Sequence, residues 1–280
     1  MSCKCSFRNF SFCSLLGKLY LSPGELKFNR SYRLDQVLGE GGFGSVYDGV
    51  RLNDGLKVAV KKIPKTNISH MEGQIPMEVA LLQHVEDVPG VAHIIDFFDM
   101  GDTFAIVFEN EGHYRDLFDI ILEKGKLEES VCKDIFKQVV EAVTMCHRRG
   151  VLHRDIKDEN IVINMKTLEA KLIDFGSGCY VHESFYQAFE GTPVYAPPEW
   201  VENKRYKAED ITVWELGILL FDMVCGDVPF MEDMQILEGK LDWRTEVSKE
   251  LKDLIEGCLN HDPGERMALF DILKHPWFLL

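Results

Sequence analysis

The chain has 280 residues, a net charge of −15, 46% hydrophobic residues and eight cysteines. This composition indicates a globular protein, and the length suits one large domain or two lobes. The negative charge disfavours nucleic acid as a partner; it favours a basic partner or serves solubility alone, and the charge does not decide between these. The cysteines lack metal-ligand spacing, which indicates reduced thiols in an intracellular protein, and no apolar run is long enough to predict a membrane span.

The first 31 residues differ from the rest of the chain. Their phenylalanines and leucines are interrupted by polar residues, so they do not have the continuous apolar core of a signal peptide. We interpret residues 1–31 as a flexible N-terminal extension. Acylation of Cys3, Cys5 or Cys13 is the alternative interpretation of this segment.

From residue 32 onward the pattern predicts an α+β protein with two lobes. Alternating or apolar runs predict strands over 32–38, 46–50, 57–63, 94–98 and 104–108, with a short helix around 78–82. Residues 109–115 are polar and contain Gly112, so they are expected to connect the lobes. Residues 116–278 have mainly helical periodicity. We therefore expect a small antiparallel lobe at 32–108 with one main helix, and a larger, mainly helical lobe at 116–278.

A glycine-rich stretch lies between the first two predicted strands. Glycines without side chains let backbone amides approach phosphate oxygens closely. A dinucleotide-binding Rossmann motif would open a helix here, but Val46 continues as a strand, so a hairpin over nucleotide phosphates is favoured. The residues expected to contact the phosphates are Gly39, Gly41, Gly42, Phe43 and Gly44.

Lys61 lies on the third predicted strand, where a cation could bind phosphate. Glu78 is its natural partner, because a carboxylate orients the ammonium and keeps it charged. The alternative is that Lys61 and Lys62 are both surface lysines. The apolar run at 58–60 argues against this for Lys61, since it makes one face of that strand apolar.

The stretch His153-Arg154-Asp155-Ile156-Lys157-Asp158-Glu159-Asn160 and the triplet Asp174-Phe175-Gly176 carry the remaining chemistry. Asp155 is expected to accept the proton of a substrate hydroxyl, and Lys157 to neutralise charge on a transferring phosphoryl group. Asn160 and Asp174 offer the hard oxygen ligands that Mg²⁺ prefers. With the glycine-rich hairpin and Lys61, these residues predict transfer of the ATP γ-phosphate.

In this order and spacing, residues 32–278 resemble a protein kinase, and Lys157 resembles the serine/threonine class. Four longer runs, at 151–160, 172–178, 195–200 and 222–227, resemble the Pim kinase family. The resemblance implies a cytoplasmic and also nuclear enzyme that prefers basic peptides and needs no activation-loop phosphate. We take the protein to be a monomer.

The resemblance also assigns roles to further residues. It implies that apolar side chains enclose the adenine, namely Leu38, Val46, Ala59, Val162 and Ile173. It implies an acidic rim that attracts Arg or Lys residues N-terminal to the target Ser or Thr, formed by Asp116, Asp119, Asp158, Glu159, Asp222 and Asp227. Beside Arg154, Glu183 or Glu190 is expected to replace an activating phosphate. Glu199 and Arg266 resemble an ion pair that locks the large lobe.

Three positions depart from the usual patterns. Pim kinases have a proline where this chain has Glu111, so we predict two adenine contacts, from the Glu109 carbonyl and the Glu111 amide. Phe108 replaces a smaller residue and should narrow the rear of the nucleotide pocket. Thr212 stands where most kinases have an aspartate that braces the catalytic loop, although Pim kinases also lack that aspartate.

A kinase-shaped scaffold that binds partners without catalysis is the competing interpretation. Every chemical position of the kinase pattern is filled in this chain, which favours an active, ATP-dependent serine/threonine kinase.

Overall fold

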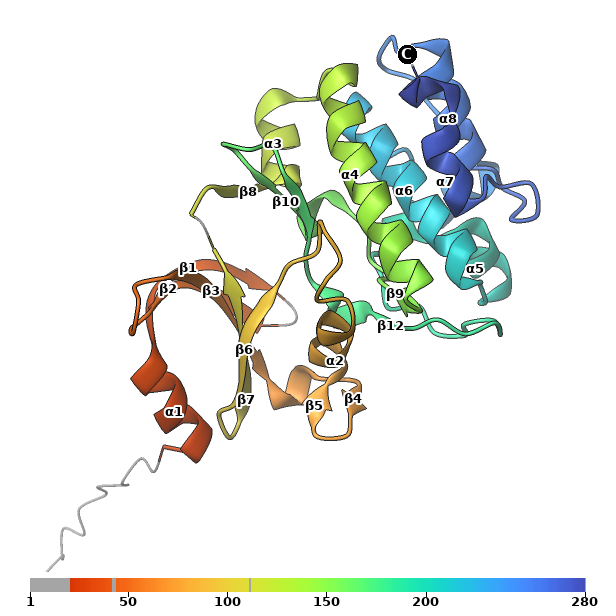
Figure 1. The fold of residues 1–280 in the computed structure, drawn as a ribbon. Coiled ribbons are helices and arrows are strands. Elements are labelled where there is room, and N and C mark those ends of the chain that lie inside the picture. Colours follow the sequence, from red (N-terminus) through yellow and green to blue (C-terminus); the bar gives the residue numbers. More distant parts are fainter. Residues whose placement is uncertain (1–20, 42–43, 111, 280) are drawn as a thin grey trace, which may run out of the picture.

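The computed structural model describes residues 21–41, 44–110 and 112–279, and in these residues it has the predicted two-lobed α+β architecture (Figure 1). Gly42, Phe43 and Glu111, which were predicted to contact the nucleotide, lie outside the described residues. Within the described part of the chain, no helix is both long and apolar enough to cross a membrane.

The small lobe is built on an antiparallel sheet of five strands in the order β1-β2-β3-β7-β6. The strands are β1 (Tyr32–Gly41), β2 (Gly44–Arg51), β3 (Lys57–Pro64), β6 (Ile94–Asp99) and β7 (Thr103–Glu109). Because side chains alternate along a strand, β3 presents Val58 and Val60 to one face and Lys61 and Ile63 to the other. The first pair is packed in a cluster with Phe28, whereas Ile63 packs beside Val79 of helix α2 (Met77–His84).

A helix that was not expected, α1 (Pro23–Ser31), covers the outer face of this sheet. The hydroxyl of Ser22 caps it by accepting a hydrogen bond from the Glu25 amide at 3.0 Å. Phe28 is 2% exposed and packs against Phe98 with ring centroids 5.4 Å apart. The prediction of a flexible extension is therefore wrong for 23–31. The start of this helix is indicated by the pattern Ser22-Pro23-Gly24-Glu25. It has a capping residue, a proline at the first helical position and a glutamate three residues after the cap.

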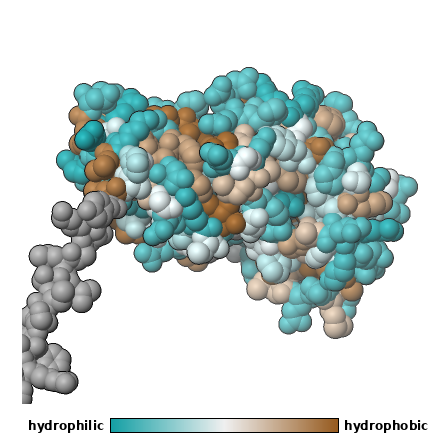
Figure 2. Space-filling view, turned by 90° about the horizontal axis from the view of Figure 1, so that it is seen from below, coloured by the Kyte–Doolittle hydropathy of each residue, from teal (hydrophilic) through white to brown (hydrophobic). Residues whose placement is uncertain are grey.

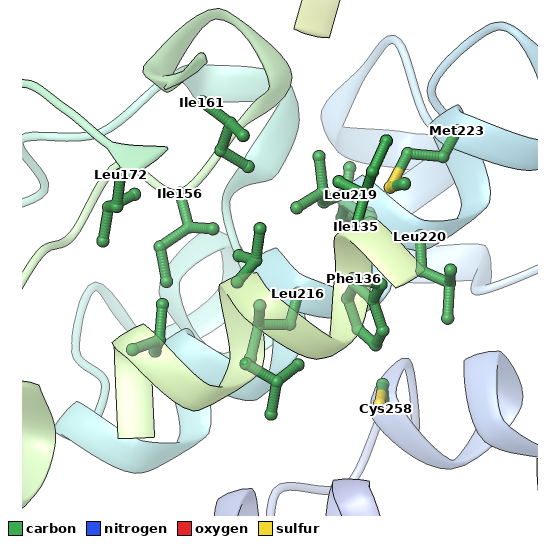
Figure 3. Close-up of a cluster of buried hydrophobic side chains, with 14 of the residues drawn as sticks. Ile135, Phe136, Ile156, Ile161, Leu172, Leu216, Leu219, Leu220, Met223 and Cys258 are labelled. Carbon is green, nitrogen blue, oxygen red and sulfur yellow. The ribbon is translucent and has the colours of Figure 1, made fainter. Parts of the chain in front are cut away.

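The large lobe is organised around α6 (Ala208–Cys225), which is buried almost all round and therefore central. It lies beside α4 (Glu129–Arg148) and α8 (Lys249–Cys258), with α3 (Leu117–Lys124), α5 (Pro198–Asn203) and α7 (Asp233–Glu238) around them (Figure 1). In Figure 3, Leu219 of α6 lies beside Ile135 of α4, and Leu216, Ile156 and Ile161 belong to the same buried cluster. The core thus continues directly beneath the stretch that carries Asp155.

Short strands hold the chemical residues on this core. They are β8 (Tyr114–Asp116), β9 (Val151–Leu152), β10 (Ile161–Asn164), β11 (Ala170–Leu172) and β12 (Cys179–Tyr180). The loop 153–160 connects β9 to β10, and Asp174 follows β11, which is paired antiparallel to β10. The start of β10 is therefore next to the end of β11, which places Asn160 close to Asp174 along the sheet.

A hairpin and several single turns complete the described structure. The hairpin β4 (Met71–Glu72) and β5 (Ile75–Pro76) directly precedes α2. Short 3₁₀ turns span Lys65–Asn67, Asp158–Asn160, Phe175–Ser177, Pro193–Tyr195, Leu269–Lys274 and Pro276–Phe278. On the face seen from below Figure 1, hydrophilic residues cover most of the surface of the protein (Figure 2).

Candidate active site

Lys61 joins the two lobes through a pair of carboxylates. Its Nζ lies 2.7 Å from Oε1 of Glu78 on α2 and 2.8 Å from Oδ1 of Asp174, which follows β11 in the large lobe. The structure thus places Lys61 on the buried face of β3 and not on the surface, since the residue is only 7% exposed.

The charges of Lys61 and Asp174 stabilise each other, whereas burial raises the pKa of Glu78 despite the Lys61 ammonium. Burial alone would lower the pKa of Lys61, but the Glu78 and Asp174 carboxylates outweigh it and raise the pKa. Burial would likewise raise the pKa of Asp174, but the Lys61 ammonium and the hydrogen bond from the Gly176 amide lower it. Lys61 is therefore a cation and Asp174 an anion at neutral pH, as a phosphate-binding lysine and a metal ligand require.

The Asp155 carboxylate is held from two sides. Oδ1 accepts hydrogen bonds from the Thr192 amide at 2.9 Å and the Thr192 hydroxyl at 2.7 Å, and Oδ2 accepts one from the Asn160 amide group at 2.9 Å. Lys157 Nζ lies 3.5 Å from Asp155 Oδ2 and donates to the Thr192 hydroxyl at 2.8 Å. Asp155, Lys157 and Asn160 therefore converge on one small region.

Asn160 and Asp174 suit a divalent cation, because they offer an amide oxygen and a carboxylate as ligands. The Asn160 Nδ2 group donates to Asp155, which leaves the amide oxygen for a ligand. The backbone carbonyl of Asn160 accepts a hydrogen bond from the Ile173 amide at 2.9 Å. Because Ile173 directly precedes Asp174, this bond keeps Asp174 close to Asn160. Asp174 itself has a left-handed backbone, with φ 59°, which is uncommon for a residue with a side chain and often marks a functional site.

The predicted adenine-contacting residues of the small lobe lie on the same face of the sheet as Lys61. Ala59 is two residues before Lys61 on β3, and Phe108 on β7 is the cross-strand partner of Ala59. Val46 on β2 is the cross-strand partner of Lys61. All three are half-buried, as expected for residues that line an opening between lobes. Leu38 on β1 and Glu109 at the end of β7 are exposed, and Gly39 is paired with Val46.

Val162 and Ile173 are the corresponding residues of the large lobe. Val162 is half-buried on β10, and Ile173 directly precedes Asp174. A groove of about 550 Å³ lies elsewhere, between Pro89, α4 and Phe270. Because this groove contains neither Lys61 nor Asp155, it is not the nucleotide site.

Six acidic residues from separate parts of the large lobe form one electrostatically coupled group. Burial, then Asp158 and Asp227, raises the pKa of Asp222 to about 8, and Asp222 shares a side-chain hydrogen bond with Asp158. Burial, then Asp119, Glu159 and Asp158, raises the pKa of Asp116. We call this group the acidic rim; it consists of Asp116, Asp119, Asp158, Glu159, Asp222 and Asp227. Such a concentration of carboxylates attracts cationic side chains.

Arg154 does not have the partner that was expected. Its Nε donates to the backbone carbonyl of Ser177 at 2.6 Å, and its guanidinium also interacts with the hydroxyl of Tyr206. Among the described residues, neither Glu183 nor Glu190 forms an ion pair with Arg154. The prediction that one of these glutamates replaces a phosphate is therefore wrong, because neutral oxygens of Ser177 and Tyr206 satisfy the arginine instead.

The predicted ion pair of the large lobe is present. Both Nη atoms of Arg266 donate to the Glu199 carboxylate at 2.9 Å, and the Arg266 side chain is 1% exposed. Thr212, in contrast, is turned toward its own helix and donates to the Ala208 carbonyl at 2.7 Å. A residue that the sequence did not mark as functional, Glu215 on α6, contacts the loop that carries Asp155.

The comparison with known proteins agrees with this geometry. Residues 32–278 match the protein kinase domain, so the chain belongs to the protein kinase family. Serine/threonine-protein kinase pim-2 of Danio rerio is 46% identical over 270 residues, which cover 91% of this chain and 87% of that protein. Serine/threonine-protein kinase prk-2 of Caenorhabditis elegans is 41% identical over 264 residues, covering 91% of this chain and 60% of that protein. The chain is thus a serine/threonine protein kinase that closely resembles the Pim kinases.

More distant kinases also match. The PAS domain-containing serine/threonine-protein kinase of Mus musculus is 33% identical over 265 residues, which cover 92% of this chain but 19% of that protein. The similarity to that larger protein therefore concerns the kinase domain and not its other regions.

Proposed function

We propose that this kinase uses ATP and Mg²⁺ to phosphorylate Ser or Thr residues that follow basic residues, and that it does so without a phosphate on its activation segment. The main support comes from the ion-pair and hydrogen-bond partners of Lys61 and Arg154. Lys61 is paired with Glu78 and Asp174, and Arg154 is bonded to neutral oxygens of the protein itself.

Each reacting group has a residue suited to it. Lys61 would hold the nucleotide phosphates, and Asn160 and Asp174 would hold Mg²⁺, which when bound neutralises phosphate charge. Asp155 would accept the hydrogen bond and the proton of the substrate hydroxyl; a carboxylate offers about four acceptor sites, so its bonds to Thr192 and Asn160 leave room for this. Lys157 would neutralise charge on the phosphoryl group during transfer.

Arg154 is the reason to propose activity without phosphorylation. In kinases that depend on an activation-loop phosphate, the phosphate orders the loop by pairing with arginine. Here the cationic Arg154 is 6% exposed, and the Ser177 carbonyl and the Tyr206 hydroxyl already occupy it. Part of the hydrogen-bonding capacity of this buried guanidinium is therefore met without a phosphate.

The activation segment, residues 174–199, is also held by contacts that involve no phosphate. The Ser177 hydroxyl donates to the Glu190 carbonyl at 2.8 Å, and the Tyr206 hydroxyl donates to the Ala188 carbonyl at 2.9 Å. Tyr186 exchanges two backbone hydrogen bonds with Tyr206, and their rings stack at 5.3 Å. The Tyr180 hydroxyl bonds Glu72 of the hairpin before α2 at 2.8 Å, which links the segment to the small lobe.

The acidic rim supports the preference for basic substrates. Two of its members, Asp158 and Glu159, follow Asp155 closely in the chain. Glu159 accepts from Lys157 at 2.5 Å, and Asp158 is bonded to Asp222. Arginines that bind there would relieve the mutual repulsion of these carboxylates, and this gain is available only to a cationic peptide.

A transfer assay tests the proposal. The protein is treated with a phosphatase, shown by mass to carry no phosphate, and incubated with ATP, Mg²⁺ and a Ser peptide with N-terminal arginines. A matched peptide with glutamines in place of the arginines is the substrate control, and Asp155→Asn is the enzyme control. We expect turnover of the arginine peptide at a rate well above that of the glutamine peptide.

Two results would contradict parts of the proposal. If the treated enzyme gains activity only after phosphorylation of Ser184 or Thr192, the proposed independence from phosphate is wrong. If the protein binds nucleotide but transfers phosphate to no peptide under any of these conditions, the scaffold interpretation is correct.

A further inference from the structure

A buried glutamate of the central helix α6 reaches the loop 153–160, which carries Asp155 and is called the catalytic loop here. Glu215 on α6 is 0% exposed, and its Oε2 accepts a hydrogen bond at 3.3 Å from the backbone amide of Ile156, the residue after Asp155. Among the described residues, Oε1 has no hydrogen-bond partner. A carboxyl group that is fully buried with one oxygen unpaired costs stability, so its presence needs an explanation beyond packing.

Thr212, one turn earlier on the same helix, does not reach this loop. Its hydroxyl donates to the Ala208 carbonyl at 2.7 Å, the bond to residue i−4 that a helical Ser or Thr commonly forms. Within the described part of the chain, Thr212 therefore gives no hydrogen bond to the loop 153–160, although most kinases have a bracing aspartate at this position.

We propose that Glu215 is the positioning residue that braces the catalytic loop from α6, in place of an acidic residue at position 212. It acts through the Ile156 amide and touches neither substrate nor nucleotide. The side chain of Ile156 is buried in the same hydrophobic cluster as Leu216 (Figure 3), so side-chain packing and the backbone bond together fix the residue next to Asp155.

The surroundings of Glu215 indicate which form of the side chain makes this bond. Burial, then the Asp155 carboxylate, raises the pKa of Glu215 well above its usual value, and Arg154 and Lys157 only partly oppose this. Tyr206, the other ionisable group that faces it, stays protonated because burial raises its pKa to about 12. The Ile156 amide thus donates to a neutral carboxylic acid, which glutamine imitates in shape and charge.

This reasoning leads to a set of matched variants. Glu215→Gln keeps a neutral acceptor, Glu215→Met keeps the volume without the acceptor, and Glu215→Asp withdraws the carboxyl by one methylene. Thr212→Val is the control on the same helix, because the hydroxyl it removes bonds only its own helix. We measure kcat, the KM for ATP and for an arginine-rich peptide, nucleotide binding and the melting temperature, with wild type prepared identically.

We expect Glu215→Gln and Thr212→Val to keep kcat within about threefold of wild type. Glu215→Met and Glu215→Asp should lower kcat by about 10- to 100-fold, because a small displacement of a catalytic group is that costly. Nucleotide affinity should change little, since no group that contacts ATP is altered; a residue with only a structural role would not separate kcat from binding in this way.

Three results would overturn the proposal. Wild-type kcat in Glu215→Asp would show that the hydrogen bond is not needed, and this variant decides the question if Glu215→Met fails to fold. Equal losses in Glu215→Gln and Glu215→Met would show that a neutral acceptor at this position is not sufficient to hold the loop. A loss in Thr212→Val as large as that in Glu215→Asp would assign the bracing to position 212. The inference rests on the family's kinase activity, and all rates are ratios to wild type, so it can fail or succeed independently of substrate preference.

Discussion

The ammonium of Lys61 and the carboxylate of Glu78 lie 2.7 Å apart, and both residues are almost completely buried. Loss of one partner from such a pair leaves the other charge poorly compensated. Here Asp174 would still neutralise Lys61, but at 2.8 Å it would hold the lysine without the opposing contact from α2. The pair therefore fixes where the ammonium stands as well as its charge.

Glu78→Gln tests this positioning. We expect kcat/KM for ATP to fall by about tenfold, because Lys61 is then held less firmly against the phosphates and a loss of about 1.4 kcal/mol corresponds to a factor of ten. Steady-state kinetics with varied ATP provides the measurement. Glu86→Gln is the control, because Glu86 is an exposed glutamate just beyond α2. Equal kinetics for the two variants would show that the Lys61–Glu78 contact is not used.

Asp155→Asn should separate chemistry from binding. The amide cannot accept the substrate proton, so we expect phosphoryl transfer to fall by about 10²–10⁴-fold. Nucleotide affinity should stay near that of wild type, because Asp155 is bonded to Thr192 and Asn160 and not to Lys61. Single-turnover transfer and nucleotide titration measure the two effects. Substantial residual transfer would mean that Asp155 is not the base.

The acidic rim should make peptide binding depend on pH. Burial and Asp158 raise the pKa of Asp222 to about 8, so Asp222 is largely protonated at pH 7 and ionised at pH 9. Because arginine stays charged throughout this range, we expect the KM for an arginine-rich peptide to fall as the pH rises through about 8. Asp222→Asn, which cannot ionise, should remove the pH dependence. A KM that does not change with pH in wild type would argue against Asp222 in substrate binding.

Ionisation of Asp222 should strengthen peptide binding but lower the stability of the folded protein. The pKa of Asp222 is higher in the folded protein than in the unfolded chain, so folding takes up a proton. The stability that this proton provides is fully present below the unfolded pKa and is lost as the pH rises through about 8. The melting temperature should therefore fall between pH 7 and pH 9 in wild type and fall less in Asp222→Asn.

Helix α1 should contribute measurably to the stability of the small lobe. Phe28 is 2% exposed between Tyr32 and Phe98, and we expect Phe28→Ala to lower the free energy of unfolding by about 3–5 kcal/mol. Leu26→Ala is the control on the same helix, since Leu26 is 44% exposed and should cost far less. Denaturant unfolding measures both. Equal, small effects would mean that α1 does not hold the sheet.

Local pattern was sufficient to predict the architecture of this chain. Alternating or apolar runs marked all five strands of the small-lobe sheet, and helical spacing marked the large lobe, because these periods follow directly from backbone geometry. The loop motif with Asp155 and Asn160 and the strand position of Lys61 could likewise be read from short stretches. Helix α1 is the exception, because the interrupted apolar residues of its segment do not indicate a helix and only its capping pattern does.

The partners of charged residues were decided by tertiary structure. Arg154 is satisfied by Ser177 and Tyr206, and no local pattern favours those oxygens over the carboxylates of Glu183 or Glu190. Helix α6 is buried on almost every side, so periodicity could not show that Glu215 and not Thr212 points toward the catalytic loop. The chain alone specified which groups are present and on which elements they lie. Which groups touch depends on long-range packing, because contact energies between charges and dipoles change steeply with distance and burial.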